Sequence, residues 1–384
     1  MPEDRHRYVG SSYRFNVVRA RMRDHPGPVL DFALGRLRQS PPDWVPDFIR
    51  EHSALALRRA SEDELQPLLG AVSSMLAREF GVDTSPDTIL VAPSGRAAIS
   101  AVVSSLIVPG DRVLVTEPGY PAFARVAAQR EARITIANLD PERNFEPDLD
   151  ALGLEADPTL RIVGLNYPNN PTGSVLARTT LDALCERLHP RTVIFNDAVY
   201  AALTYEHSSF SLLAGAHAEG PPRLELHSLG KLASLGPLAV SFLVGGKETV
   251  DAIRQYSEFA WTQLDSLQIR VATRFLDSWE HVTLVRDGFR DRLDRLREVV
   301  TRLGFDPYPV AAGTYLLCRR PSAVRDRPVE SASAAADLLL KDFGLAVVPW
   351  DDPSPGYLRF SAAYVPADFD ALVELASGLP LVSS

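Results

Sequence analysis

The chain has 384 residues, of which 46% are hydrophobic and 23% are charged, so it can bury a large core in one large domain and one smaller domain. Its formal net charge of −9 argues against nucleic acid as the main partner. The polar N-terminus lacks the apolar core of a signal peptide, and no apolar run approaches the length of a membrane span. Cys185 and Cys318 lie too far apart to suggest a disulfide framework or a zinc site, so we expect a cytoplasmic protein without a metal ion.

Residues 1–45 are predicted to form an N-terminal arm and a strand that joins the smaller domain. The strand is the short apolar run Val29–Gly35, which is followed by a proline-rich turn. Ser61 and Glu64 then have the spacing of a capping box, so a helix should begin there and extend to Phe80.

A large domain is predicted over residues 46–280, because apolar runs of strand length recur there between helical segments. These runs are Thr88–Ala92, Arg112–Thr116, Arg133–Ala137, Arg161–Leu165, Thr192–Phe195 and Arg223–His227. Such alternation is typical of an α/β fold with a mostly parallel, doubly wound sheet that is covered by helices on both faces.

A smaller α+β domain is predicted over residues 281–384. Two long amphipathic helices, 247–279 and 281–303, lead into it, and a closing helix is expected after Pro366. Short strands are expected between them, near Tyr315–Cys318, Ala346–Pro349 and Tyr357–Phe360.

Polar residues follow several of the predicted strands, at the edge of a parallel sheet where ligands bind. Ser94-Gly95-Arg96 opens a helix after the first strand, and this is either a phosphate site or a simple strand-to-helix turn. Tyr120 follows the next strand, either as a ligand contact or as a core aromatic residue. Asn166–Gly173 holds more turn-forming residues than a turn requires, which favours a polar side chain beside a ligand.

Asp197 and Lys231 follow two further strands. Asp197 ends an apolar run, where a carboxylate is costly to bury unless it faces a cation or a protonated ring nitrogen. Lys231 is one of only three lysines in the chain, and a lysine amine, unlike a guanidinium, can condense with an aldehyde. On this stretch alone, a surface lysine in a loop is the alternative.

Together, the NYPNNPTG sequence at Asn166–Gly173, NDAVY at Asn196–Tyr200 and SLGK at Ser228–Lys231 resemble the fold-type I pyridoxal-phosphate enzymes of the class I/II aminotransferase family. The resemblance covers nearly the whole chain, from the strand before Gly35 to Arg359. It implies a pyridoxal 5′-phosphate cofactor, an amino acid substrate and a homodimer. It also implies an aminotransferase that works through a Schiff base on Lys231 and an external aldimine with the substrate.

The resemblance implies catalytic roles for Lys231, Asp197 and Tyr200. Lys231 would form the Schiff base with the cofactor and then shuttle a proton. Asp197 would keep the pyridine nitrogen protonated. Asn170 and Tyr200 would hydrogen-bond the phenolic oxygen, and Tyr120 would stack on the ring.

Binding of the phosphate and of the substrate is implied in the same way. Arg359 would bind the substrate α-carboxylate through a bidentate pair, with Gly35 close to it. The residues expected to hold the phosphate are Ser94, Gly95, Arg96 and Ser228.

The chain departs from the family where most members carry a phosphate-binding arginine, because Ala239 occupies that position. Arg96 is one replacement for it, and Arg58 or Arg59 is another. The departures leave the ring chemistry intact, so the alternative to transamination is a specialised biosynthetic enzyme that catalyses β/γ-elimination or replacement, cyclisation or oxidation. The remaining candidates, which are either substrate contacts or structural residues, are Tyr13, Arg14, Arg36 and Trp350.

Two other classes of protein are less consistent with the sequence. A nucleotide-dependent dehydrogenase would carry G-x-G-x-x-G after the first strand, and this chain does not. The acidic net charge of the chain argues against a non-catalytic module that senses pyridoxal phosphate and binds DNA.

Overall fold

The computed structural model describes residues 8, 14–35, 37, 39–154, 156–205, 210–215, 220–261 and 264–383. Its centre is an eight-stranded sheet with the strand order β2-β9-β8-β7-β6-β3-β4-β5. The neighbouring pairs from β8 to β4 are all parallel, whereas β9 runs antiparallel to both β2 and β8, and β5 runs antiparallel to β4. The strands are β2 (Ile89–Ala92), β3 (Arg112–Glu117), β4 (Arg133–Asp140), β5 (Glu146–Pro147), β6 (Leu160–Leu165), β7 (Val193–Asp197), β8 (Arg223–Ser228) and β9 (Ser241–Gly245).

Helices cover both faces of this sheet, which confirms the predicted α/β class. Consecutive residues of β7 show why its sequence is apolar throughout: Phe195 packs with the helices of one face and Ile194 with those of the other. One face carries α5 (Gly95–Leu106), α6 (Ala122–Gln129) and α9 (Lys247–Ala260). The opposite face carries α8 (Arg178–Arg187) and the short α7 (Leu149–Leu152).

Strand β9 was not predicted. Its residues form an apolar run that ends at Gly245-Gly246, and the sequence offers no helical crossover before it. The strand returns antiparallel from β8 through a short loop and inserts between β8 and β2. It therefore places Ser241 opposite Ser228, at the end of β8.

The predicted capping box is present at the start of α4 (Glu62–Phe80). The Ser61 side chain accepts a hydrogen bond from the Glu64 backbone, and the Glu64 side chain accepts one from the Ser61 backbone. The helix ends at Gly81, whose positive φ of 64° suits glycine.

The segment predicted as one helix over 247–279 is two helices. The structure ends α9 at Ala260 and begins α10 (Ser266–Asp277) after Asp265, whose side chain caps it in a second capping box. Capping signals inside an amphipathic pattern therefore mark a break that the periodicity alone conceals.

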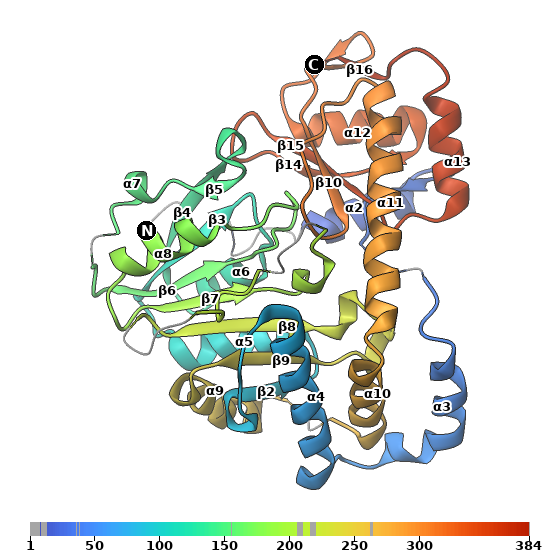
Figure 1. Ribbon diagram of the computed structural model, residues 1–384. Helices are drawn as coiled ribbons and strands as arrows, with labels where there is room; N and C mark the ends of the chain where they lie inside the picture. The colour runs from blue at the N-terminus through green and yellow to red at the C-terminus, as the bar shows by residue number, and fades with distance from the viewer. Residues whose placement is uncertain are drawn as a thin grey trace.

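The C-terminal part of the chain forms a smaller unit around the antiparallel sheet β10-β15-β14. In Figure 1, α11 (Glu280–Arg302) runs from the base of the large unit to this smaller unit, where α12 and α13 pack. We propose residue 280 as the boundary between the units, because α11 begins there. The elements of the smaller unit are β10 (Tyr315–Arg319), β11 (Ala323–Val324), β12 (Arg327–Pro328), α12 (Ala332–Phe343), β13 (Leu345–Ala346), β14 (Val348–Trp350), β15 (Tyr357–Ser361), α13 (Pro366–Leu375) and β16 (Val382–Ser383).

The N-terminal strand pairs with a strand of the C-terminal part of the chain. Strand β1 (Leu30–Asp31) pairs in parallel with β13, and α2 (Arg14–Asp24) precedes it. Helix α3 (Trp44–His52) lies between β1 and α4. Within the described residues, no helix is both long and apolar enough to cross a membrane, and no cluster of side chains suits a metal ion.

Candidate active site

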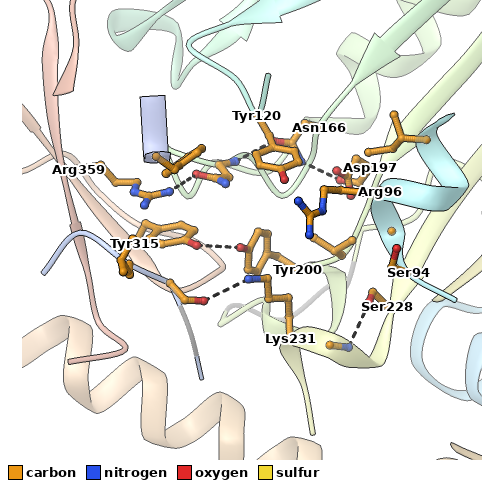
Figure 2. Close-up of a pocket in the computed structure, with 18 of the residues that line it drawn as sticks. Ser94, Arg96, Tyr120, Asn166, Asp197, Tyr200, Ser228, Lys231, Tyr315 and Arg359 are labelled. Atoms are coloured by element: carbon orange, nitrogen blue, oxygen red, sulfur yellow. Dashed lines mark hydrogen bonds between the residues drawn. The ribbon is translucent and has the colours of Figure 1, made fainter. Parts of the chain in front are cut away.

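A cavity of about 490 Å³ lies where the parallel strands end, and it is lined by every residue to which the family resemblance gives a catalytic, cofactor-binding or substrate-binding role. Its size is typical of a small-molecule site. Figure 2 shows these side chains pointing inward from the sheet edge, from helix α5 and from the smaller unit. The lining residues are Phe15, Asn16, Arg19, Leu34, Gly35, Ser94, Gly95, Arg96, Ile99, Tyr120, Asn166, Asn170, Asp197, Val199, Tyr200, Ser228, Gly230, Lys231, Tyr315 and Arg359.

Lys231 is the lysine of this cavity. It lies one short turn beyond β8, where the Ser228 side chain accepts a hydrogen bond of 3.1 Å from the Gly230 backbone. Its Nζ donates to the carbonyl oxygen of Gly35 at 3.2 Å, so the amine is held inside the cavity. Lys247, by contrast, pairs with a carboxylate on the exposed face of α9.

Asp197 is a buried carboxylate at the end of β7, with only 5% of its surface exposed. Its Oδ1 has no hydrogen-bond partner within the part of the chain that the structure describes. Burial raises the pKa of this carboxyl to about 7, although a backbone hydrogen bond from Val199 and the charge of Lys231 act in the opposite direction. An N–H donor in the cavity would therefore be strongly attracted to Oδ1.

The Asn166–Gly173 segment is a hydrogen-bonded cradle as well as a turn. The Asn166 side chain donates to the backbone oxygen of Asp197 at 2.9 Å and accepts from the backbone of Asn170 at 3.0 Å. The Asn170 oxygen in turn accepts from Arg359 at 2.9 Å. This arrangement fixes the Asn170 side chain with its NH₂ group available to a ligand.

Arg359 lies in β15 and is only 1% exposed. Its guanidinium donates to the backbone oxygen of Ala33 at 2.7 Å and lies 3.8 Å from the centre of the Tyr315 ring. Both the hydrogen bonds and the aromatic face hold the guanidinium plane in one orientation. This rigidity suits bidentate binding of a carboxylate.

The opposite end of the cavity is formed by the start of α5. The Ser94 side chain caps the helix by accepting from the Ala97 backbone at 3.2 Å, and Ser228 lies nearby, where its hydroxyl accepts from Ser241 at 2.8 Å. Figure 2 shows the Arg96 guanidinium extending from α5 into the cavity. A helix N-terminus and a guanidinium together favour an anion such as a phosphate.

Several lining residues were missed by sequence reasoning. Phe15, Asn16 and Arg19 come from α2, and Tyr315 comes from β10, so both elements reach the cavity only through packing of the smaller unit. The signal that could have identified Tyr315 is a polar aromatic residue directly after the Gly313-Thr314 turn and before an apolar strand.

The remaining candidates do not line the cavity or fall outside the described residues. Arg14 stacks on Trp350 at 4.3 Å, and Trp350 is fully buried behind Arg359. Arg58 forms an ion pair of 2.7 Å with Glu64, outside the cavity. Tyr13 and Arg36 lie outside the residues that the structure describes.

A lysine amine, a buried carboxylate and an anion-binding helix N-terminus at the edge of a doubly wound sheet define a pyridoxal-phosphate-dependent enzyme of fold type I. The chain belongs to the aminotransferase class I and II family, whose model matches residues 29–374. It is thus a PLP-dependent aminotransferase that acts on an amino acid.

Proteins with similar sequences are named as aminotransferases. The probable N-succinyldiaminopimelate aminotransferase DapC of Mycobacterium tuberculosis is 31% identical over 299 residues, which are 76% of this chain and 74% of that protein. The LL-diaminopimelate aminotransferase of Methanocaldococcus jannaschii is 26% identical, over 93% of this chain and 87% of its own length.

Solved structures have the same fold. N-succinyldiaminopimelate aminotransferase from Mycobacterium tuberculosis superposes with a TM-score of 0.85 at 25% identity, covering 98% of this chain and 99% of its own. A double mutant of Thermus thermophilus aspartate aminotransferase superposes with a TM-score of 0.85 at 23% identity, with the same coverage.

Proposed function

We propose that this enzyme transfers the amino group of a dicarboxylic amino acid to a 2-oxo acid, with Lys231 as the cofactor-binding and proton-transferring residue. The observation that carries this proposal is the convergence of Lys231, Asp197 and Arg359 on one cavity. Each provides chemistry that transamination requires: an amine, a buried carboxylate and a fixed guanidinium.

The side chains of the cavity fit the cofactor. When bound, pyridoxal phosphate supplies an aldehyde that accepts the amino group and a ring that withdraws electrons. The unpaired Oδ1 of Asp197 would accept the ring N–H, and this bond would keep the carboxyl ionised. Tyr120 would stack on the ring, and Asn170 and Tyr200 would donate to its phenolic oxygen.

The phosphate would lie at the start of α5. Ser94, Gly95 and Ser228 line this end of the cavity, and Arg96 extends into it. Ala239 lies beside Gly230 of the cavity lining, since a Cβ added at Gly230 would be 3.8 Å from the Ala239 Cβ. Arg96 would supply the positive charge that an alanine at this position lacks. One guanidinium on the helix would thus replace another on the loop.

The substrate would be oriented by Arg359. Its guanidinium would bind the α-carboxylate, and this contact would bring the α-carbon towards Lys231 Nζ, the base that removes the Cα proton. Gly35, whose carbonyl accepts from Lys231 Nζ in the cofactor-free structure, would lie next to the same carboxylate.

The position of Arg19 favours a substrate that carries a second carboxylate. It lines the mouth of the cavity, and within the described residues its bond is to the neutral side chain of Asn16, at 3.2 Å. Two other arginines of the same helix, Arg21 and Arg23, pair with Asp337 and Asp24. The names of the relatives, which act on diaminopimelate derivatives or aspartate, agree with an acidic group at the far end of the substrate.

We also propose a homodimer located in the cytoplasm. Leu57 and Phe259 are 93% and 91% exposed in the single chain, which is unusual for large apolar side chains and would be explained by a second copy. Cys185 and Cys318 are free thiols, as expected in a reducing compartment.

The test uses the purified protein reconstituted with pyridoxal phosphate. Aspartate, glutamate and diaminopimelate are each offered with a 2-oxo acid acceptor, and both products are quantified in wild type and Lys231→Ala. We expect equal amounts of the new 2-oxo acid and the new amino acid, with the reaction abolished in Lys231→Ala. Release of ammonia, consumption of oxygen or a cyclic product without the new amino acid would show a specialised reaction instead.

A further inference from the structure

Tyr315 is a second phenol beside Tyr200 in the cavity. It begins β10, is only 4% exposed and lies under the guanidinium of Arg359. The Tyr200 hydroxyl donates to the Tyr315 oxygen at 3.1 Å, and the two rings meet edge to face with centres 5.8 Å apart. Figure 2 shows this pair in the centre of the cavity, between Arg359 and Lys231.

Gly35 makes room for the Tyr315 hydroxyl. A Cβ atom at position 35 would lie 2.0 Å from the Tyr315 oxygen, so any other residue there would displace it. The carbonyl of the same glycine accepts from Lys231 Nζ. The hydroxyl of Tyr315 therefore lies within the cluster of atoms that surrounds the reactive amine.

A phenol has one proton to donate. While Tyr200 donates to Tyr315, it has none for another acceptor, and the proposed function gives it the phenolic oxygen of the cofactor. We propose that Tyr315 is a positioning residue that controls whether Tyr200 directs its proton to the cofactor or to Tyr315. This inference rests on the proposed function, because that function provides the second acceptor.

The charged and titratable groups that face Tyr315 explain how its state changes. In the cofactor-free protein, burial raises the pKa of Tyr315, but the positive charges of Lys231 and Arg359 outweigh this and lower it to about 8. Burial and the neighbouring Tyr315 raise the pKa of Tyr200 well above its usual range. The negative charge of Asp197 acts on Tyr200 in the same direction.

Two arrangements follow from these directions. In the first, Tyr315 donates its own proton to the Tyr200 oxygen, which leaves the Tyr200 proton for the cofactor. In the second, Tyr200 donates to Tyr315, as it does in this structure, and loss of the Tyr315 proton would strengthen that bond. The hydrogen bond to the cofactor would be present in the first arrangement and absent in the second.

The test is a pH titration of the absorbance of the bound cofactor, from about pH 5.5 to 10. In wild type, the main step reports the arrangement in which Tyr200 donates to Tyr315. In Tyr315→Phe, Tyr200 donates to the cofactor at every pH. The phenolic oxygen of the cofactor then attracts the proton on the Lys231 nitrogen less strongly. This nitrogen loses its proton more readily, so the main step moves to lower pH by about one unit.

The effect must depend on Tyr200. In the Tyr200→Phe background, Tyr315→Phe should cause no further shift. Tyr205→Phe is the matched control, because this partly buried phenol donates to the Gly313 carbonyl outside the cavity, and it should leave the titration unchanged.

Two outcomes would overturn the inference. They are an unchanged titration in Tyr315→Phe and an equal shift in the presence and absence of the Tyr200 hydroxyl. Each would leave the proposed function intact, because the absorbance of bound cofactor would still be present. A protein that binds no cofactor would overturn both.

Discussion

Gly35 and Tyr315 fit together so closely that no side chain can be added between them: a Cβ atom at position 35 would lie 2.0 Å from the phenol oxygen and 2.8 Å from the carbon that carries it. Position 35 belongs to the N-terminal segment and position 315 to β10, so this fit joins two distant parts of the chain at the cavity.

Gly35→Ala should therefore damage catalysis. Tyr315 has to move, and the guanidinium of Arg359 above it loses its support. We expect kcat/KM to fall by about 100-fold, since displacements of about 1 Å at a reacting centre have effects of this size. Gly70→Ala is the control: it lies in α4 with open space around it, and it should leave kcat/KM unchanged while raising stability by about 0.5–1 kcal/mol. Full activity in Gly35→Ala would contradict the prediction.

Arg96→Gln should weaken cofactor binding. A hydrogen bond to a charged group contributes about 1.5–3 kcal/mol, so the Kd for pyridoxal phosphate should rise by roughly 10- to 100-fold, with part of the affinity regained in Arg96→Lys. Equilibrium dialysis measures this directly. Arg58→Gln tests the competing candidate, and we expect little change, because Arg58 is already paired with Glu64. A larger loss in Arg58→Gln than in Arg96→Gln would assign the phosphate to Arg58.

Asp197 should make the cofactor-free protein less stable as pH rises. Its carboxyl holds a proton up to about pH 7 in the folded state but only to about pH 4 when unfolded, so the folded state binds more protons between these values. The free energy of unfolding should fall with a slope of up to about 1.4 kcal/mol per pH unit in this window.

Urea unfolding of wild type and Asp197→Asn between pH 4 and pH 8 measures this slope. The difference in stability between the two proteins should decrease as pH rises. Glu225 provides the opposite case: although burial raises its pKa, hydrogen bonds from His227, Ser211 and Leu212 lower it below its usual range. Glu225→Gln should therefore remove stability that is present at neutral pH and lost in acid. A pH-independent difference for Asp197→Asn would contradict the assigned direction.

Arg19→Gln should weaken recognition of dicarboxylic amino acids only. Because Arg19 is exposed, its interaction contributes at most about 1 kcal/mol, so KM for aspartate or glutamate should rise by up to about fivefold. KM for alanine should not change. Arg23→Gln, on the same helix, is the control. An equal effect on all three amino acids would show that Arg19 acts on the fold and not on the substrate.

Much of the large unit was predictable, because its strands are buried on both faces and therefore appear as apolar runs. Asp197, which ends one of these strands, and Lys231, which follows another, were predictable for the same reason: polar groups at such positions have few structural explanations. Strand β9 was missed because it returns antiparallel without a helix, and the break after α9 was missed because α9 and α10 share one amphipathic pattern.

The part of the cavity contributed by the N-terminal helix and the smaller unit was less predictable. Arg359 was identified through a family resemblance, whereas Tyr315 and Arg19 were not identified at all. Their presence at the cavity depends on how α2 and β10 pack against the large unit, and local sequence patterns carry no information on packing between such distant segments.

The guanidinium of Arg359 bonds to Ala33, which lies 326 positions earlier in the chain, and to Asn170, which lies 189 positions earlier. These contacts come from the beginning, the middle and the end of the polypeptide. During synthesis, the chain therefore lacks a complete binding cavity for the amino acid until β15 has left the ribosome and paired with β10 and β14. The appearance of turnover during translation or refolding would then report completion of the sheet β10-β15-β14, and a protein shortened at either end would lose activity before it lost its large sheet.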